Sequence, residues 1–170
     1  MTEDVLRGRI HDLPGYVKGS LLLLIWTLAF GYTAGMVYLQ DTTSFEAQGI
    51  EENYLGNESD EEAEELSFKM SRKQVLNIIH SHVISYTLIF FMLATILVFS
   101  SVALPWKRVL LIEPPVSILL TFGGLWLLWS GLVWMKYVIM VSGMALSAGF
   151  YLMVVMISLD IIKGRREGSS

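Results

Sequence analysis

The sequence predicts an all-α integral membrane protein, a bundle of four transmembrane helices with one acidic extramembrane loop. The 170 residues are 54% hydrophobic and only 16% charged, with a mean hydropathy of +0.55, whereas an ordinary soluble domain is about 25% charged. Four stretches with almost no charge are long enough to cross a bilayer, which takes about 20 apolar residues. None shows the alternation of a membrane β-barrel, so helices are the structure that satisfies their backbone in lipid.

We expect the spans at residues 19–39, 78–104, 114–134 and 137–162, within a single membrane domain comprising residues 1–170. Residues 40–77 then form a loop between the first two spans. The first span has small residues at Gly31 and Gly35 that resemble a signal-peptide cleavage site. Its apolar run nevertheless continues to full spanning length, so we interpret it as a retained span.

Basic residues predict the orientation of the bundle. With four spans, the N-terminal arm, the loop after the second span and the C-terminal tail lie on one face. That face carries most of the 12 Lys and Arg residues, namely Arg7, Arg9, Lys18, Lys107, Arg108, Lys163, Arg165 and Arg166. Because basic loops stay on the cytoplasmic side, we expect both termini in the cytoplasm and the loop 40–77 outside.

Composition and motifs exclude several classes of function. A formal net charge of -4 gives no basic surface for nucleic acid. The absence of cysteine excludes disulfides, thiolate metal sites, c-type haem and a cysteine nucleophile. The chain contains no Gly-rich nucleotide loop, Ser/His/Asp set or HExxH motif, so hydrolase or kinase chemistry of the soluble type has no support.

The outer loop is strongly acidic around residues 58–65, where the sequence reads ESDEEAEE. Such charge density repels itself, and we interpret this stretch first as solvated and mobile. The alternative is a docking surface for a basic partner, such as a basic soluble electron carrier. Its residues would be Glu58, Asp60, Glu61, Glu62, Glu64 and Glu65. The spacing is not that of a calcium-binding EF-hand loop.

Small residues in the first and fourth spans predict close helix packing, which in lipid depends on small side chains and interhelical hydrogen bonds. The first span contains a GxxxG step, and the fourth contains several small residues at helical spacing. The predicted packing residues are Gly31, Gly35, Gly143, Ser147 and Gly149. Packing within the chain is the first interpretation, and contact with another subunit or a flat cofactor remains open.

Few ionisable or amphipathic groups fall within the spans. Glu113 precedes two prolines, a pattern typical of a helix start at the interface; a proton relay is the alternative if residues 109–112 lie in the bilayer. Asp160 is expected to pair with the basic tail. Trp126 and Trp129 are expected to share a mid-span face.

Histidines are the most informative polar residues. His80 and His82 lie at the expected outer mouth of the second span. Residues two apart on a helix point to nearly opposite sides, so one imidazole can face the bundle while the other faces lipid headgroups or a partner. Interfacial histidines are the first interpretation. The alternatives are ligation of a b-type haem or a metal with a ligand from elsewhere, or proton and quinone chemistry.

A resemblance to a known group of proteins covers the first two spans. It is carried by Gly31-Tyr-Thr-Ala-Gly35, Thr42-Thr43, Gly49-Ile-Glu-Glu-Asn-Tyr-Leu-Gly56 and Met70-Ser-Arg-Lys-Gln-Val-Leu-Asn-Ile-Ile-His-Ser-His82. These features resemble small four-span bacterial membrane proteins that accompany cytochrome-containing respiratory or electron-transfer systems. The resemblance implies a bacterial inner membrane and a role beside redox machinery, with His80 and His82 as cofactor-binding positions.

The leading functional hypothesis is a mainly structural, non-catalytic subunit of a larger respiratory or electron-transfer complex. Its partners would be other membrane subunits, the lipid bilayer and a basic soluble electron carrier, with no nucleic acid. A small homo-oligomeric transporter or channel is the first alternative, although the spans carry few polar groups at mid-membrane. A membrane enzyme acting on lipid or quinone is the second.

Overall fold

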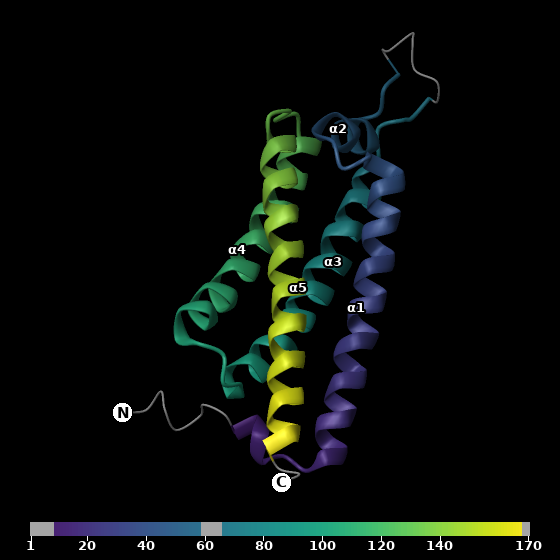
Figure 1. The fold of residues 1–170 in the computed structure, drawn as a ribbon. Helices are drawn as coiled ribbons and strands as arrows, with labels where there is room; N and C mark the ends of the chain where they lie inside the picture. The colour runs from purple at the N-terminus through teal and green to yellow at the C-terminus, as the bar shows by residue number, and fades with distance from the viewer. Residues whose placement is uncertain (1–8, 59–65, 168–170) are drawn as a thin grey trace.

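A computed structural model describes residues 9–58 and 66–167 (Figure 1). Four helices are long and apolar enough to cross a membrane: α1 (Gly15–Thr43), α3 (Arg72–Phe99), α4 (Leu104–Trp129) and α5 (Met135–Glu167). A 3-10 turn, η1 (Arg9–Asp12), precedes α1, and a short helix, α2 (Ala47–Leu55), follows it. The predicted all-α bundle of four membrane helices is confirmed.

Consecutive spans run in opposite directions, because each connection returns the chain at the end where the preceding helix stops. With four spans, both ends of the bundle sequence lie on the same side. The start of α1, the turn between α3 and α4 and the end of α5 lie at one end of the bundle, which we call the basal end (Figure 1). Helix α2 and the turn between α4 and α5 lie at the other, the α2 end. Lys18, Lys107 and Lys163, which contribute to the predicted orientation, therefore share the basal end.

Helix α2 lies within the stretch expected to be a loop. The chain turns after α1 through Ser44 and Phe45, which both have positive φ. Gly49 permits the return, because a Cβ at this position would overlap the backbone of Thr43. Ile50 is then buried against the bundle, and Glu51 accepts a 2.6 Å salt bridge from Lys136 of α5. A nine-residue helix is too short to be recognised from hydropathy, which explains why the sequence did not predict it.

Helix α3 begins six residues before its expected start at residue 78. Ser71 and Gln74 form a capping box: the Ser71 side chain accepts from the Gln74 backbone N–H, and the Gln74 side chain accepts from the Ser71 backbone N–H at 2.8 Å. This reciprocal cap satisfies backbone donors that a helix start otherwise leaves unpaired. His80 and His82 consequently lie well inside the helix and not at its mouth.

Helix α4 also begins earlier than expected, and this corrects the interpretation of Glu113. The helix starts at Leu104, where Pro105 occupies the first turn, and Pro114 and Pro115 lie inside it. Proline fits the first turn because the missing N–H would be unpaired there. In the sequence, either Pro105 or the pair Pro114–Pro115 could therefore mark the start of the helix. Glu113 is therefore an internal residue of α4 and does not mark its start.

The pair of tryptophans at the end of α4 is also not at mid-span. Helix α4 ends at Trp129, so both indoles lie in its last turn. Lys69 lies over the Trp129 ring at 5.1 Å, and Arg72 over the Trp126 ring at 6.0 Å. The Trp129 indole also donates a 2.8 Å hydrogen bond to the Met70 carbonyl. These contacts are typical of the aromatic belt at a membrane interface.

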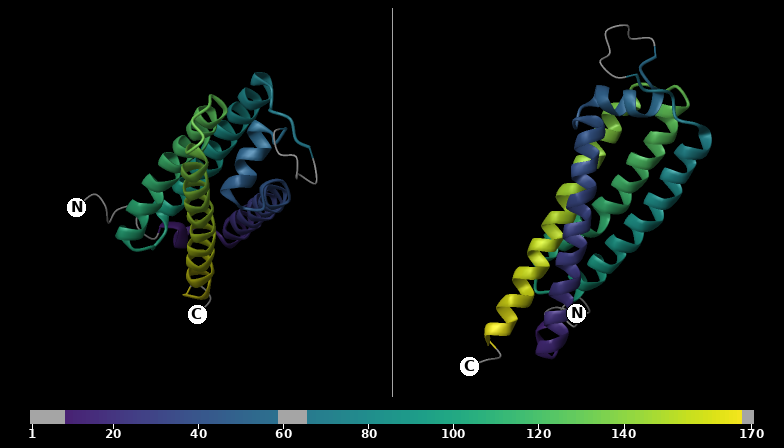
Figure 2. Two further views of the ribbon diagram at one scale, coloured as in Figure 1. Left: turned by 90° about the horizontal axis from the view of Figure 1, so that it is seen from above. Right: turned by 90° about the vertical axis from the view of Figure 1, so that its right-hand side faces the viewer.

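Helix α5 is the centre of the bundle, with α4, α3, α2 and α1 all packed against it (Figure 2). Its residues Phe150, Met153 and Ile157 are fully buried. The Phe150 ring stacks on Tyr32 of α1 with centroids 4.0 Å apart and meets Phe90 of α3 edge-on at 6.1 Å. One side chain of α5 thus joins three helices.

We expect Phe150→Ala to lower the free energy of unfolding by about 3 kcal/mol, because it leaves a cavity where three helices meet. The measurement is unfolding in mixed micelles of rising dodecyl sulfate content. Phe91→Ala is the matched control, since Phe91 is 71% exposed. Equal losses in the two variants would contradict the central position of Phe150.

Candidate functional site

The two histidines of α3 occupy different surroundings. His82 Nδ1 lies 2.8 Å from the Ile78 carbonyl oxygen. Because a carbonyl only accepts, this hydrogen bond has Nδ1 donating and leaves Nε2 as an acceptor. The His82 ring packs 5.6 Å from Phe122 and 6.1 Å from Tyr86. Both histidines are exposed, and His80 lies about 160° away around the helix, where no ring contact is found for it among the described residues.

The surroundings of His82 continue across the bundle as an aromatic cluster, which we define as His82, Tyr86, Phe122, Tyr32 and Phe150. Tyr86 meets Phe122 at 5.7 Å and Tyr32 at 5.7 Å. Tyr32 reaches α5, where its hydroxyl shares a 3.0 Å hydrogen bond with Ser147. The His82 ring itself contacts Tyr86 and Phe122, and the cluster continues from them to α1 and α5.

A shallow apolar groove of about 420 Å³ runs between α3 and α4 beside this cluster. Its lining includes Ile79 and Val83 from α3 and Ile118, Phe122 and Trp126 from α4. Phe122 is thus shared by the groove and by the aromatic cluster around His82. The groove fits a flexible apolar chain, such as the acyl chain of a lipid or the isoprenoid tail of a quinone.

Metal ligation was one interpretation of the histidine pair. Because α3 has begun ten residues before His82, the two imidazoles project from different sides of a regular helix. Among residues 9–58 and 66–167, no group of three or more His, Cys, Asp or Glu side chains could hold a metal ion. A metal on His82 would therefore need ligands other than the imidazole and carboxyl groups of these residues.

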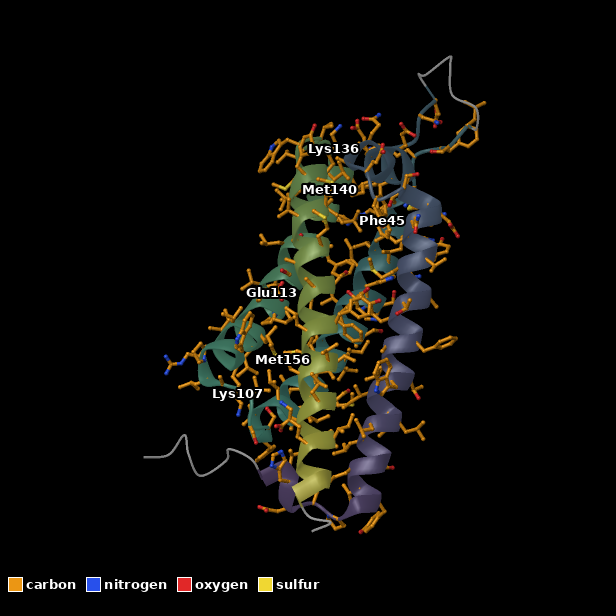
Figure 3. All side chains as sticks on the ribbon, viewed as in Figure 1. Phe45, Lys107, Glu113, Lys136, Met140 and Met156 are labelled. Atoms are coloured by element: carbon orange, nitrogen blue, oxygen red, sulfur yellow. The ribbon has the colours of Figure 1, made fainter. Side chains whose placement is uncertain are left out.

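Glu113 is the carboxyl group at the contact of α4 with α5. Its Oε1 accepts a 2.6 Å hydrogen bond from Ser117, one turn further along α4. Its Oε2 is buried and has no hydrogen-bond partner among the described residues. On α5 the carboxyl group faces Gly149, where a Cβ would overlap Oε2. Figure 3 shows Glu113 beside α5 between Met140 and Met156.

Hydroxyl groups continue from Glu113 along the same interface. Ser117 is buried, and Thr121 follows one turn later on the same side of α4. The Thr121 hydroxyl shares a 2.7 Å hydrogen bond with Ser142 of α5, which is also buried. Glu113, Ser117, Thr121 and Ser142 thus form a polar line, directed toward the α2 end.

A second polar cluster lies at the basal end, which we call the basal cluster: His11, Ser101 and Asp160. Asp160 was expected to pair with the basic tail, but its Oδ1 lies 3.3 Å from His11 Nε2 and its Oδ2 accepts a 2.8 Å hydrogen bond from the Ser101 backbone. The Ser101 hydroxyl lies 3.5 Å from the same His11 nitrogen. A catalytic relay needs the two ring nitrogens to face different partners, so this cluster joins three segments and does not activate the serine.

Two lysines at the basal end are buried, and their ammonium groups donate hydrogen bonds to backbone carbonyls. Lys107 Nζ donates to the carbonyls of Val98 and Ser100 at 2.9 and 2.7 Å. This satisfies the end of α3, where carbonyls lack helical partners and a cation is favourable. Lys18 Nζ donates to the His11 carbonyl at 2.6 Å. The basal end is therefore held by charge-assisted hydrogen bonds across chain segments.

The predicted packing residues divide into two groups. Gly149 contacts Glu113, and Ser147 bonds to Tyr32 and donates to the Met36 sulfur at 3.4 Å. At Gly31, Gly35 and Gly143, in contrast, an added Cβ would meet nothing within 4 Å. The GxxxG step of α1 therefore lies on a face that the described part of the chain does not cover.

The predicted docking residues fall mostly outside the described part of the chain. Glu58 is exposed at the end of the segment that follows α2. Asp60, Glu61, Glu62, Glu64 and Glu65 lie in residues 59–65, which the structure does not describe. Docking of a basic partner remains a prediction.

Comparison with protein families supplies the classification. Residues 44–168 match the Aq_1264_TM family, described as a transmembrane helical domain, over nearly three quarters of the chain. The chain belongs to this family. No curated protein and no solved structure matches it. Together with the four apolar helices, the family identifies a multi-pass membrane protein, and the matched region contains His82, Glu113 and Asp160 while α1 precedes it.

The chain positions of the basal cluster explain why sequence reasoning missed it. His11 lies in η1, Ser101 in the turn between α3 and α4, and Asp160 within α5, and no spacing rule links them. The aromatic cluster was likewise invisible, because its members alternate with lipid-facing residues on four helices. The polar line along α4 did carry a signal, since Glu113, Ser117 and Thr121 repeat every four residues.

We expect Asp160→Ala to release η1 from the end of α5. Backbone amide hydrogen exchange in residues 10–13 should then become faster, because both the His11 contact and the Ser101 hydrogen bond depend on this carboxylate. Hydrogen exchange with mass spectrometry in detergent checks this. Asp12→Ala, at an exposed position of the same turn, is the control and should leave the exchange of α5 and of the α3–α4 turn unchanged. Unaltered exchange in Asp160→Ala would contradict the fastening role.

Proposed function

We propose that this protein is an integral membrane subunit of a larger complex, and that helix α1 provides a contact to a neighbouring subunit. The observation that carries the proposal is the uncovered GxxxG step of α1. Only 11% of the spanning window of α1 is buried, compared with 39% for α4 and for α5. In lipid, small residues allow helix backbones to approach closely, so this face suits another helix.

Two opposite faces of α1 support this reading. Ile25 and Ala29 are buried, and Tyr32 packs on α5. On the other side, a small-residue face consists of Thr27, Gly31, Ala34 and Gly35, all exposed. The small-residue face is bordered by exposed large side chains, among them Leu24, Phe30 and Tyr38. A helix that served only to complete this bundle would not need that outward face.

We expect Gly31→Leu combined with Gly35→Leu to dissociate the protein from its neighbours, because two large side chains would hold the backbones apart. Native gel electrophoresis of gently solubilised membranes, with mass spectrometry of co-purifying proteins, measures the assembly. Gly19→Leu is the control, an exposed glycine of the same helix outside the small-residue face. Loss of assembly in the control alone, or unchanged assembly in the double variant, would contradict the proposal.

The complex is proposed to be a respiratory or electron-transfer system, with a quinone as the cofactor in contact with this chain. Three features support the quinone: the accepting Nε2 of His82, the aromatic rings around it, and the adjacent apolar groove. An accepting imidazole nitrogen can take the hydroxyl proton of a quinol in a hydrogen bond. A b-type haem would use the same nitrogen but needs a second axial ligand from another subunit.

We expect His82→Ala to reduce the quinone that co-purifies with the protein by several-fold, since it removes the imidazole nitrogen that would accept the hydrogen bond of the quinol. Extraction of the lipids and chromatography of the quinones measures this, and a visible absorption spectrum detects any haem. His80→Ala is the matched control because His80 is an exposed histidine two residues away. Equal quinone content in both variants would refute the quinone site, and loss of a Soret band in His82→Ala would replace quinone by haem.

We propose a bacterial inner membrane with the basal end in the cytoplasm. Support comes from the basic residues of that end, among them Lys18, Lys107 and Lys163. The α2 end would then face the periplasm or the exterior. A basic soluble electron carrier could bind there through the acidic loop, of which Glu58 is exposed.

A further inference from the structure

The carboxyl group of Glu113 lies beside the middle of the apolar span of α5. Its neighbour Gly149 is the central residue of the α5 span Met135–Lys163, about 21 Å from either end along the helix. The start of α4 at Leu104 places Val109 and Ile112 within the helix, and both are exposed to the surroundings of the bundle. The turn that leads to Glu113 therefore faces lipid. An ionisable residue at this depth costs free energy, so its presence points to a function.

Among the described residues, the carboxyl group of Glu113 has a hydrogen-bond donor but no basic side chain as an ion-pair partner. Ser117 donates to Oε1, while Oε2 is buried without a hydrogen-bond partner among the described residues. Helix α5 has no Asp, Glu, Lys or Arg between Lys136 and Asp160, and α3 has none after Lys73. The other titratable groups of these two helices in that range are His80, His82, Tyr86, Tyr137 and Tyr151, and the nearest charged residues of α4 are Lys107 and Arg108.

Gly149 makes room for the second oxygen. A side chain at this position would overlap Oε2, so the glycine leaves space that the carboxyl group occupies. The site is thus a carboxyl group fixed by one hydroxyl, with one oxygen left over. A proton on that oxygen needs no further ligand, whereas a sodium or other metal cation needs about six oxygen ligands.

Three hydroxyls lie between the site and the α2 end. Ser117 and Thr121 follow Glu113 at intervals of one turn, and Thr121 shares its hydrogen bond with Ser142 across the interface. Each hydroxyl can both donate and accept, so each can pass on a proton with the help of bridging water. The remaining surroundings of this interface are apolar, including Leu125 and Leu146.

We propose that Glu113 is a proton-binding residue at mid-membrane, loaded and unloaded from the α2 end along Ser117, Thr121 and Ser142. This is a functional site in addition to the subunit and quinone roles, and it rests on neither. The step is a proton transfer: the Ser117 hydroxyl, which bonds to Oε1, passes its proton to the carboxylate and takes up another from a bridging water or a neighbouring hydroxyl, and the carboxyl group returns to a carboxylate when the proton leaves.

The first experiment is labelling of the full-length protein in its native membrane with dicyclohexylcarbodiimide, which enters lipid. The acid proton of Glu113 would move to a carbodiimide nitrogen while the carboxyl oxygen bonds to the central carbon, and rearrangement leaves a stable acylurea. Peptide mass spectrometry should find the adduct on Glu113, and Glu113→Gln should abolish it. Absence of the adduct on Glu113 would overturn the proposal, and protection by sodium ions would replace the proton by sodium.

The second experiment measures proton movement in liposomes that contain the purified full-length protein and a pH-sensitive dye, with a potassium gradient and valinomycin as driving force. We expect Glu113→Gln to lower the flux about tenfold or more, and Ser117→Ala and Thr121→Val to lower it in part. Glu58→Gln, an exposed carboxylate in the loop, is the control and should retain the flux.

The Glu113→Gln variant distinguishes a loss of proton binding from a loss of folding or of subunit assembly. Glu113→Gln keeps the size of the side chain and can still accept from Ser117, so an unchanged elution volume and thermal midpoint show that it folds. Equal proton flux in the wild-type protein and in Glu113→Gln would overturn the proposed proton transfer. This outcome is independent of the assembly measurements, which use α1 variants and do not touch Glu113.

Discussion

The packing of α4 on α5 is the contact on which the rest of the bundle depends. In lipid, apolar side chains gain little by leaving the solvent, so helices associate through close contacts and interhelical hydrogen bonds. The α4–α5 interface has both: Gly149 and Gly124 allow close approach, and Thr121 bonds to Ser142. Helix α3 then packs mainly on α4 and α1 on α5, which leaves α1 and α3 with large lipid-facing surfaces.

Polar groups in this protein are placed where two or more helices meet. The basal cluster fastens η1, the α3–α4 turn and α5, and Lys107 satisfies the carbonyl groups at the end of α3. Tyr32 carries its hydroxyl to Ser147 across the α1–α5 contact. These groups are satisfied by the protein, as buried polar groups in a low-dielectric medium must be. Among the described residues, Glu113 Oε2 and Ser158 Oγ differ, since both are buried without a hydrogen-bond partner, and of the two only Glu113 carries an ionisable group.

The membrane-spanning region therefore combines two kinds of surface with different uses. The small-residue face of α1 points outward, and we propose that another helix packs on it. The groove between α3 and α4 is apolar and lies beside His82, and it suits a chain-like apolar molecule. The family match begins immediately after α1 and includes the groove, His82 and Glu113. The proposed cofactor and proton sites thus lie in the region that the family model matches, and the proposed assembly contact lies in α1.

The amino-acid sequence by itself determined the number of spans, the all-α class and the alternating topology, because hydrocarbon admits only backbone that bonds to itself and length sets the crossings. It did not determine where helices begin: the capping box at Ser71 and Pro105 in the first turn of α4 moved two starts outward, and helix ends carry weaker signals than apolar runs. Tertiary structure alone decided that Glu113 faces Gly149 and that Asp160 meets His11. Such contacts join residues far apart in the chain, and only the packing of the helices brings them together.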